Sequence, residues 1–223
     1  MPFFPTQPQE MYLGYDVAFF GAPIAPIFLQ YKVSSHLTRP NASEWGLFNR
    51  DYYRFNVYPD TRSPQHNRLV DLARSGEAVF YCAPMFSGFP QYANLYSTRT
   101  VADNSAFVPC GALPKITGGQ PHHVIYASQS VVGYFLSGDP QPFRCTLGKE
   151  QLVSLVRREG RHFQPLAEVI PRLRRALAQE DGPGFSRGDP RTAPLGDLEV
   201  LAQTAMARFG LALGFVRQSR LEP

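Results

Sequence analysis

Near the amino terminus, apolar runs of strand length alternate with short breaks. The stretch 12–33 contains two aromatic and β-branched runs, and the Gly/Pro-containing segment 21–26 separates them. This pattern predicts a β-hairpin. Because side chains alternate across a strand, we expect Gln30 and Lys32 to share one face of the second strand. Asp16, in the first strand, is expected opposite them on that face.

Further along, the pattern predicts a strand, a helix and another strand. Residues 51–58 alternate apolar and polar positions, as a half-buried strand does, whereas 78–83 form a continuous apolar run, typical of a strand buried on both faces. Between them, 63–76 open with Ser-Pro-Gln and close with Ser-Gly, which are favourable helix start and stop signals. The order of these elements is typical of an α/β sheet.

The middle of the chain is less regular. A short helix is expected at 43–49, and glycines and prolines divide 84–146 into short segments. These segments predict short strands and loops that complete the sheet. The segments are 91–98, 105–109, 122–126 and 133–136.

After residue 146 the composition becomes helical and basic. Residues 149–158 and 165–179 have the apolar spacing of amphipathic helices, and 182–194 are rich in Gly, Pro and Arg, as flexible linkers are. A last helix at 195–209 leads into a short strand at 211–216. The first two helices and the residues just after the first carry six arginines, at Arg157, Arg158, Arg161, Arg172, Arg174 and Arg175.

These patterns predict two regions. Residues 1–146 are expected to form an α/β core with a mixed central sheet flanked by helices, and 147–223 a basic helical extension with a linker near 182–194. The arginines of the extension suit a phosphate backbone, a solvated helix face or a partner subunit, and the sequence leaves these alternatives open.

Composition points to a folded protein inside the cell. Hydrophobic residues make up 43% of the 223 residues, and the net charge of +4 is compatible with a polyanionic partner. The three cysteines are widely spaced, so a disulfide framework is not expected. The start lacks a signal-peptide pattern, and no 18-residue apolar run occurs. We therefore expect a cytoplasmic protein without a membrane partner.

An acid, an amide and an amine on one face of an apolar hairpin need an explanation. Polar groups in such a place are costly unless they are paired or bind something. One interpretation is an ion pair between Lys32 and Asp16 across the two strands. The other is a binding site. Lysine is rare in this chain, with three among 22 basic residues, which weakly favours a role for Lys32.

The order of these residues resembles a known catalytic motif. Glu10, then Asp16 at a strand start, then Gln30 and Lys32 on the next strand resemble the core of the PD-(D/E)XK nuclease superfamily. The closer resemblance is to its type IV restriction (Mrr-like) branch, in which glutamine replaces the second acid. It extends over roughly residues 10–86, and it implies a restriction-endonuclease-like fold and metal-dependent hydrolysis of phosphodiester bonds.

The resemblance also implies a role for each residue. Asp16, Gln30 and the backbone carbonyl of Tyr31 would hold Mg²⁺ or Mn²⁺, since hard cations prefer oxygen ligands. Lys32 would position the attacking water and offset charge on the phosphorane. Glu10 would hold a second ion or a water, although an acid in the first turn of a helix gives the same pattern.

A sixth residue comes from the helix that follows. In the family this helix often adds a polar residue to the site, and Gln65 matches that position, with His66 beside it. The alternative is that both are polar residues of a helix N-terminal turn. His122 and His123 are adjacent on a predicted strand and point to opposite faces, so a zinc site is not expected there.

The expected partner is nucleic acid, DNA in preference to RNA, in a bacterial anti-phage or restriction system. An activating partner protein or self-association is a further expectation. Two alternatives remain open at this point. One is a nuclease fold that binds nucleic acid or a protein without cutting, and the other is an unrelated α/β protein in which the hairpin acid and lysine simply pair.

Overall fold

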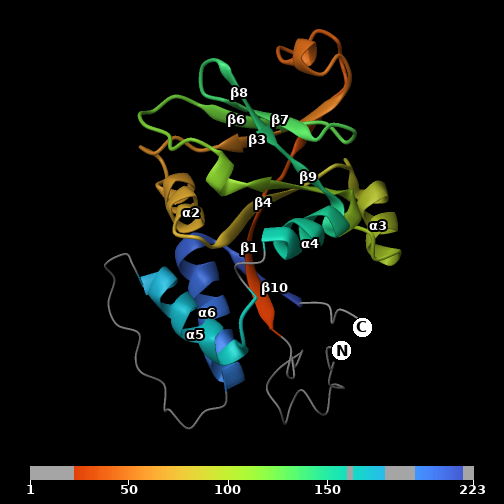
Figure 1. Ribbon diagram of the computed structural model, residues 1–223. Helices are drawn as coiled ribbons and strands as arrows, with labels where there is room; N and C mark the ends of the chain where they lie inside the picture. Colours follow the sequence, from red (N-terminus) through yellow and green to blue (C-terminus); the bar gives the residue numbers. More distant parts are fainter. Residues whose placement is uncertain (1–22, 160–162, 179–193, 218–223) are drawn as a thin grey trace. The chain divides into compact units, whose positions relative to one another are not determined.

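Figure 1 shows the chain as a computed structural model, in which residues 23–159, 163–178 and 194–217 are described. Within these ranges the protein is a mixed α/β protein with five α-helices and two five-stranded sheets, one mixed and one antiparallel. Phe28–Arg158 forms one compact unit, and the described residues on either side of it belong to a second. The division near residue 146 stays a prediction from composition.

The mixed sheet contains the strand that leads to Lys32. Its strand order is β10-β1-β4-β5-β9. These strands are β1 (Ile24–Tyr31), β4 (Ala78–Pro84), β5 (Ser105–Pro109), β9 (Thr146–Leu147) and β10 (Ala212–Arg217). All of β4 except its last residue is buried, as its continuous apolar pattern predicts.

The second sheet is antiparallel throughout and has the order β2-β3-β6-β7-β8. Its strands are β2 (Ser35–Leu37), β3 (Tyr52–Val57), β6 (His122–Tyr126), β7 (Val132–Leu136) and β8 (Pro140–Arg144). Along β3, Phe55 and Val57 are buried and Asn56 is exposed, which confirms the predicted alternation. Tyr52, on the other face, is also buried, because Trp45 and Phe48 belong to the apolar cluster around it.

Four of the five helices match their sequence signals to within a residue or two. These are α2 (Gln65–Arg74), α4 (Gly148–Glu159), α5 (Leu166–Ala178) and α6 (Pro194–Phe209). The apolar stripe predicted for α5 is buried and includes Val169, Leu173 and Leu177. Residues 182–193 of the predicted linker lie outside the described residues, and no helix in the described part of the chain is long and apolar enough to cross a membrane.

Two local predictions are wrong in the middle of the chain. Residues 91–98, expected to be strand or loop, belong to helix α3 (Phe89–Ser97). Its tyrosines and asparagine at even positions imitate a strand alternation, while the start after Gly88 and the proline in the first turn are helix signals. The helix expected at 43–49 is a single 3-10 turn, Trp45–Leu47.

Two predictions about pairing are also wrong. The strands form two sheets instead of one central sheet, because β3 pairs with β6 and not with β1. The loop expected at 21–26 ends earlier, since β1 already begins at Ile24. The cause is a distant partner: Ile24 exchanges two backbone hydrogen bonds with Gln164, of 3.0 and 3.1 Å. A local pattern carries no signal for either pairing.

The second sheet depends on a glycine in β7. A Cβ atom at Gly133 would lie 2.5 Å from Phe143 Cζ and 2.9 Å from the carbonyl oxygen of Ile125. We therefore expect Gly133→Ala to lower the free energy of unfolding by about 1–3 kcal/mol, as overpacking does. Urea denaturation measures this change.

Gly46 offers a matched control, because a Cβ atom there would meet no atom within 4 Å. Gly46→Ala should change the free energy of unfolding by no more than about 0.5 kcal/mol. Equal stability of the two variants would contradict the packing described for Gly133.

Candidate active site

Lys32 follows β1 directly and is held beside β4. Its backbone N–H donates to the carbonyl oxygen of Cys82 at 2.9 Å, which continues the strand pairing by one residue. Its side-chain Nζ lies over the ring of Tyr81, 5.1 Å from the ring centroid. Tyr81 is 1% exposed, so the amine sits against a buried aromatic wall in cation–π geometry.

The Lys32 cavity is small and mostly lined by polar side chains. Its free volume is about 10 Å³, close to the space of one water molecule. The lining consists of Lys32, Val57, Tyr58, Ser63, Gln65, His66 and Tyr81. Lys32 directly follows β1 and Gln65 is the first residue of α2, so two of the six predicted site residues line one cavity.

Burial lowers the pKa of the Lys32 amine below its ordinary value. A negatively charged Cys110 thiolate would raise the pKa of Lys32 and so oppose this shift. However, complete burial raises the pKa of Cys110 far above its usual range, so this thiol is neutral at physiological pH and contributes little charge. The lowered pKa of Lys32 therefore reflects desolvation.

Gln30 and Tyr31 lie together at the end of β1. Gln30 is half-buried, and its Nε2 donates to the carbonyl oxygen of Tyr31 at 3.4 Å. The Tyr31 side chain is 61% exposed. The amide group of Gln30 and the Tyr31 carbonyl are thus neighbours, with the amide nitrogen facing the carbonyl oxygen, and neither residue lines the Lys32 cavity. Asp16 and Glu10 lie outside the described residues, and their roles stay predictions.

His66 is a buried neighbour of Gln65 whose protonation state follows from its partners. Its Nε2 lies 2.9 Å from the carbonyl oxygen of Pro114, and its Nδ1 lies 2.8 Å from the Tyr81 hydroxyl. A carbonyl only accepts, so Nε2 carries the proton. Nδ1 of the neutral ring then accepts the hydrogen bond that Tyr81 donates.

The pKa of His66 is lowered, which keeps this ring neutral. Burial is the main cause; the Pro114 carbonyl opposes the shift, and the charges of Lys32 and His122 add to it. The ring is also fixed by stacking, 6.1 Å from the ring of Tyr81 and 5.7 Å from that of Phe135. His66 therefore forms a rigid and uncharged wall behind the Lys32 cavity.

His122 and His123 point to opposite faces of β6, as predicted. His122 is 2% exposed and stacks on Phe135, and burial lowers its pKa. The Nδ1 of His123 contacts the side-chain oxygen of Asn56 at 2.9 Å. Within the described ranges, no group of three or more His, Cys, Asp or Glu residues is arranged to hold a metal ion.

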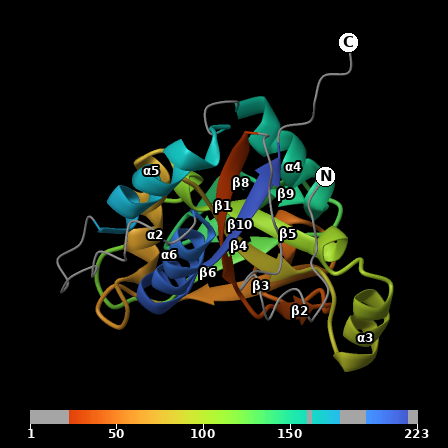
Figure 2. The ribbon, with the colours of Figure 1, turned by 90° about the horizontal axis from the view of Figure 1, so that it is seen from below.

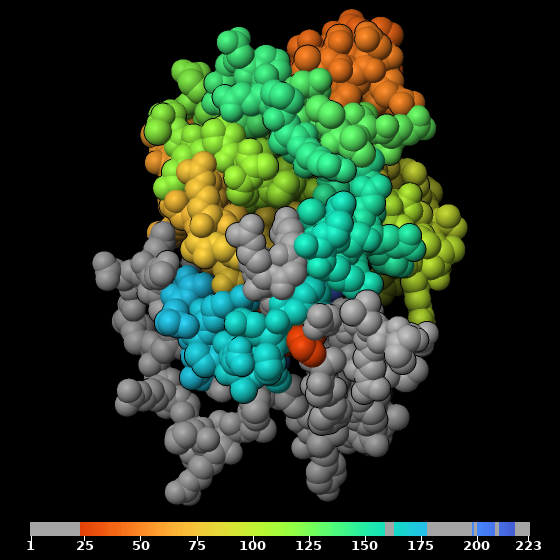
Figure 3. All heavy atoms as spheres, in the orientation of Figure 1, coloured from red at the N-terminus to blue at the C-terminus, as the bar shows by residue number. Residues whose placement is uncertain are grey.

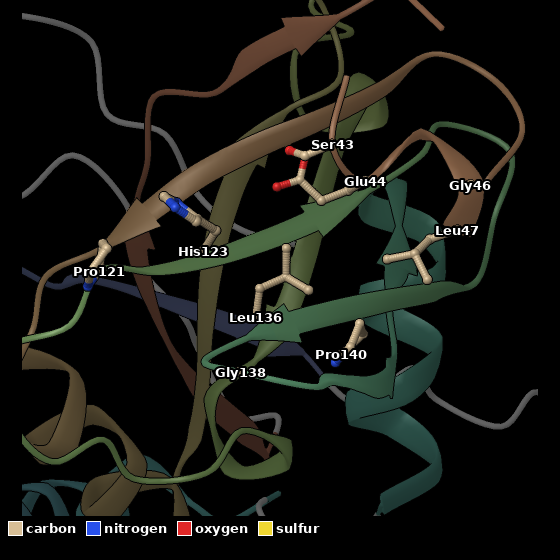
Figure 4. Close-up of a pocket in the computed structure, with 9 residues that line it drawn as sticks. All are labelled: Ser43, Glu44, Gly46, Leu47, Pro121, His123, Leu136, Gly138 and Pro140. Carbon is tan, nitrogen blue, oxygen red and sulfur yellow. The ribbon is translucent and has the colours of Figure 1, made fainter. Parts of the chain in front are cut away.

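A larger groove of about 550 Å³ lies on the second sheet. Figure 4 shows its lining, which includes Glu44 near the 3-10 turn, His123 on β6 and Leu136 on β7. Glu44 accepts hydrogen bonds from Tyr52, at 2.5 Å, and from Arg54, at 3.3 Å. Its carboxylate is thus occupied by structural contacts, and no residue predicted for the site lines this groove.

Two residues of the site could not be found from the sequence. Tyr81 is one of several aromatic residues in an apolar strand, and Pro114 contributes only a backbone carbonyl.

No protein-family model, curated protein or solved structure matches this chain. Support for a function therefore comes from the geometry of the Lys32 cavity and from the motif residues around it.

The neutral His66 leads to a prediction about pH. A histidine whose pKa is lowered by folding binds fewer protons than in the unfolded chain, so its stabilising contribution is complete above pH 6.5, the ordinary pKa of histidine, and falls as the pH drops below it. His66→Gln should reduce the loss of unfolding free energy between pH 7 and pH 5, since an amide does not titrate and still offers a donor to Pro114.

The measurement is urea denaturation at a series of pH values. His122 also has a lowered pKa, so His66→Gln should remove only part of the pH dependence, and His66→Gln/His122→Gln more of it. An unchanged slope in the single variant would show that His66 is not held neutral by its surroundings.

Proposed function

We propose that this protein is a metal-dependent nuclease that hydrolyses phosphodiester bonds of DNA or RNA in the cytoplasm, as part of a bacterial restriction or anti-phage system. The observation that carries the proposal is the shared cavity of Lys32 and Gln65. The nuclease motif assigns both to one site, and they come from different elements of the chain.

The fold offers coarser support. The strand that leads to Lys32 is next to β4 in a mixed sheet, and α2 precedes β4 in the chain. This arrangement is compatible with a restriction-endonuclease-like sheet. The antiparallel second sheet would then be an addition to that core, which extends the protein beyond the motif region.

The side-chain oxygen of Gln30 and the carbonyl oxygen of Tyr31 are of the kind that a hard divalent cation takes as ligands. The amide of Gln30 and the carbonyl of Tyr31 are adjacent at the end of β1, and Asp16 would supply the negative charge that these neutral groups lack. Bound there, Mg²⁺ or Mn²⁺ would polarise the phosphate and lower the pKa of a bound water. Because Gln30 stands in place of an acid, the site has one negative charge fewer. The phosphate of the substrate would therefore contribute to the affinity for the metal ion.

The chain's own part in the reaction would be carried by Lys32. Its amine is a compact point charge that can orient an attacking water and offset the charge growing on the phosphorane. Tyr81 and the neutral His66 behind it would restrict where the amine points. Gln65 would hold a water at the mouth of the same cavity.

A second candidate function is binding without cleavage. The observation that favours it is the size of the Lys32 cavity, which takes about one water and not a phosphate group. A nuclease fold with its lysine packed on Tyr81 would then serve as a module that binds nucleic acid or a partner protein.

Replacing Lys32 tests the proposal. We expect Lys32→Met to lower the rate of cleavage about 10²–10³-fold, as the loss of one group that stabilises transition-state charge does. Its free energy of unfolding should be unchanged or higher, because the variant no longer buries an amine. Lys115→Met is the matched control, since Lys115 pairs with Asp71 at the surface, at 2.6 Å.

The assay uses supercoiled plasmid, linear DNA and RNA with Mg²⁺ or Mn²⁺. Asp16→Asn should be as inactive as Lys32→Met. Equal cleavage by wild type and Lys32→Met would remove Lys32 from the mechanism, whereas salt-dependent binding by a wild-type protein that cuts no substrate would support the second candidate.

A further inference from the structure

Helix α3 carries a row of aromatic rings on its surface. We call Phe86, just before the helix, and Phe89, Tyr92 and Tyr96 within it the aromatic ladder, because the ring of Tyr92 contacts each of the other three. The centroid of the Tyr92 ring lies 6.2, 6.4 and 5.9 Å from those of Phe86, Phe89 and Tyr96. Phe89 is 77% and Tyr96 68% exposed. Spacings of three and four residues place these side chains on one side of the helix.

This helix does not bury a face of its own. None of its nine residues is buried, although Leu95 is partly covered. In Figure 2, α3 stands apart from the strands of the unit Phe28–Arg158, and Figure 3 shows its yellow-green atoms at the surface. These exposed rings make α3 a candidate interaction site.

The chemistry of the segment indicates the kind of partner. Residues 78–102 contain no Asp or Glu, and Arg99 is their only charged residue. Within residues 86–100 the large exposed hydrophobic side chains are all aromatic, with no exposed leucine, isoleucine, valine or methionine. Ring faces without carboxylates, next to an arginine, suit a ligand that offers flat bases and negative phosphates.

Arg99 occupies a position where its side chain is not favoured. It follows Thr98, the C-cap of α3, and adopts a φ of 57°, in the left-handed region. Glycine is the usual residue at this place, because a Cβ atom is strained there. The backbone N–H of Arg99 donates to the carbonyl oxygen of Tyr96 at 3.1 Å. Arg99 therefore lies about one helical turn after Tyr96, the last residue of the aromatic ladder. The local backbone gives no reason for an arginine at this position.

We infer that α3 binds single-stranded nucleic acid, with bases stacked on the aromatic ladder and a phosphate near Arg99. The inference rests on the proposed function in taking nucleic acid as the ligand, and it adds that this nucleic acid is single-stranded. In a duplex the base faces are already stacked on each other, whereas a single strand can offer them to aromatic side chains.

The test is fluorescence anisotropy in EDTA, where metal-dependent cleavage does not occur. The probes are a labelled 12-nucleotide DNA, the RNA of the same sequence and the corresponding 12-base-pair DNA duplex. Wild type should bind the single strands more tightly than the duplex, and the DNA and RNA arms report which sugar it prefers. Tyr96→Ala should weaken single-strand binding about tenfold, the effect of losing one stacked base.

Arg99→Gly separates binding from folding. Glycine relieves the left-handed strain, so the variant should be at least as stable as wild type while it binds single strands several-fold more weakly and with a smaller salt dependence. Arg74→Ala is the charge control, because Arg74 is exposed at the end of α2, outside the ladder. It should bind like wild type.

Three results would overturn the inference: equal affinity for single strand and duplex, unchanged binding by Tyr96→Ala, or binding of anionic vesicles that depends on Tyr96 while oligonucleotide binding does not. The nuclease proposal is tested separately. It fails if Lys32→Met cuts plasmid as fast as wild type, whereas the binding inference is judged only by wild type, Tyr96→Ala and Arg99→Gly in EDTA, where no cleavage occurs.

Discussion

The burial of one amine is the constraint on which the candidate site depends. The backbone bond from Lys32 to Cys82 fixes the end of β1 against β4, and the side chain then has the Tyr81 ring as its neighbour. Removing a charge from water is unfavourable, and the lowered pKa of Lys32 records this cost. An amine in such a place is more readily explained by function than by folding.

Hydrogen bonds fix the side chains of His66 and Tyr81 beside this amine, and the donor and acceptor of each bond can be assigned from their chemistry. The Pro114 carbonyl requires the proton on Nε2 of His66, and Nδ1 must then accept from Tyr81. The hydroxyl of Tyr81 is thereby turned toward His66, and its ring face is left to Lys32. A protonated His66 would break this order and place a second positive charge near the amine, so burial of the histidine and placement of the lysine depend on each other.

Local sequence patterns predicted most of the helices and strands, but they did not predict how the strands pair into sheets. The period of β3 and the cap signals of α2 are properties of a few neighbouring residues, so they could be read from the sequence. The partner of β3 is β6, which lies far along the chain, and only long-range packing selects it. For the site, a motif resemblance pointed to Gln65 and Lys32, whereas Tyr81 was hidden in an apolar run where every residue looks equally buried.

The choice of lysine at position 32 runs against the composition of the chain, and the cavity explains it. The other two lysines form surface ion pairs, Lys115 with Asp71 at 2.6 Å and Lys149 with Asp103 at 3.0 Å, a role that arginine fills as well. At position 32 the larger guanidinium would need more room than the space of about one water that the Lys32 side chain leaves beside it, and it would stay charged whatever its surroundings. A slender amine fits there, and its pKa responds to burial. Between the two long basic side chains, lysine is therefore the one whose charge the surroundings of the cavity can adjust.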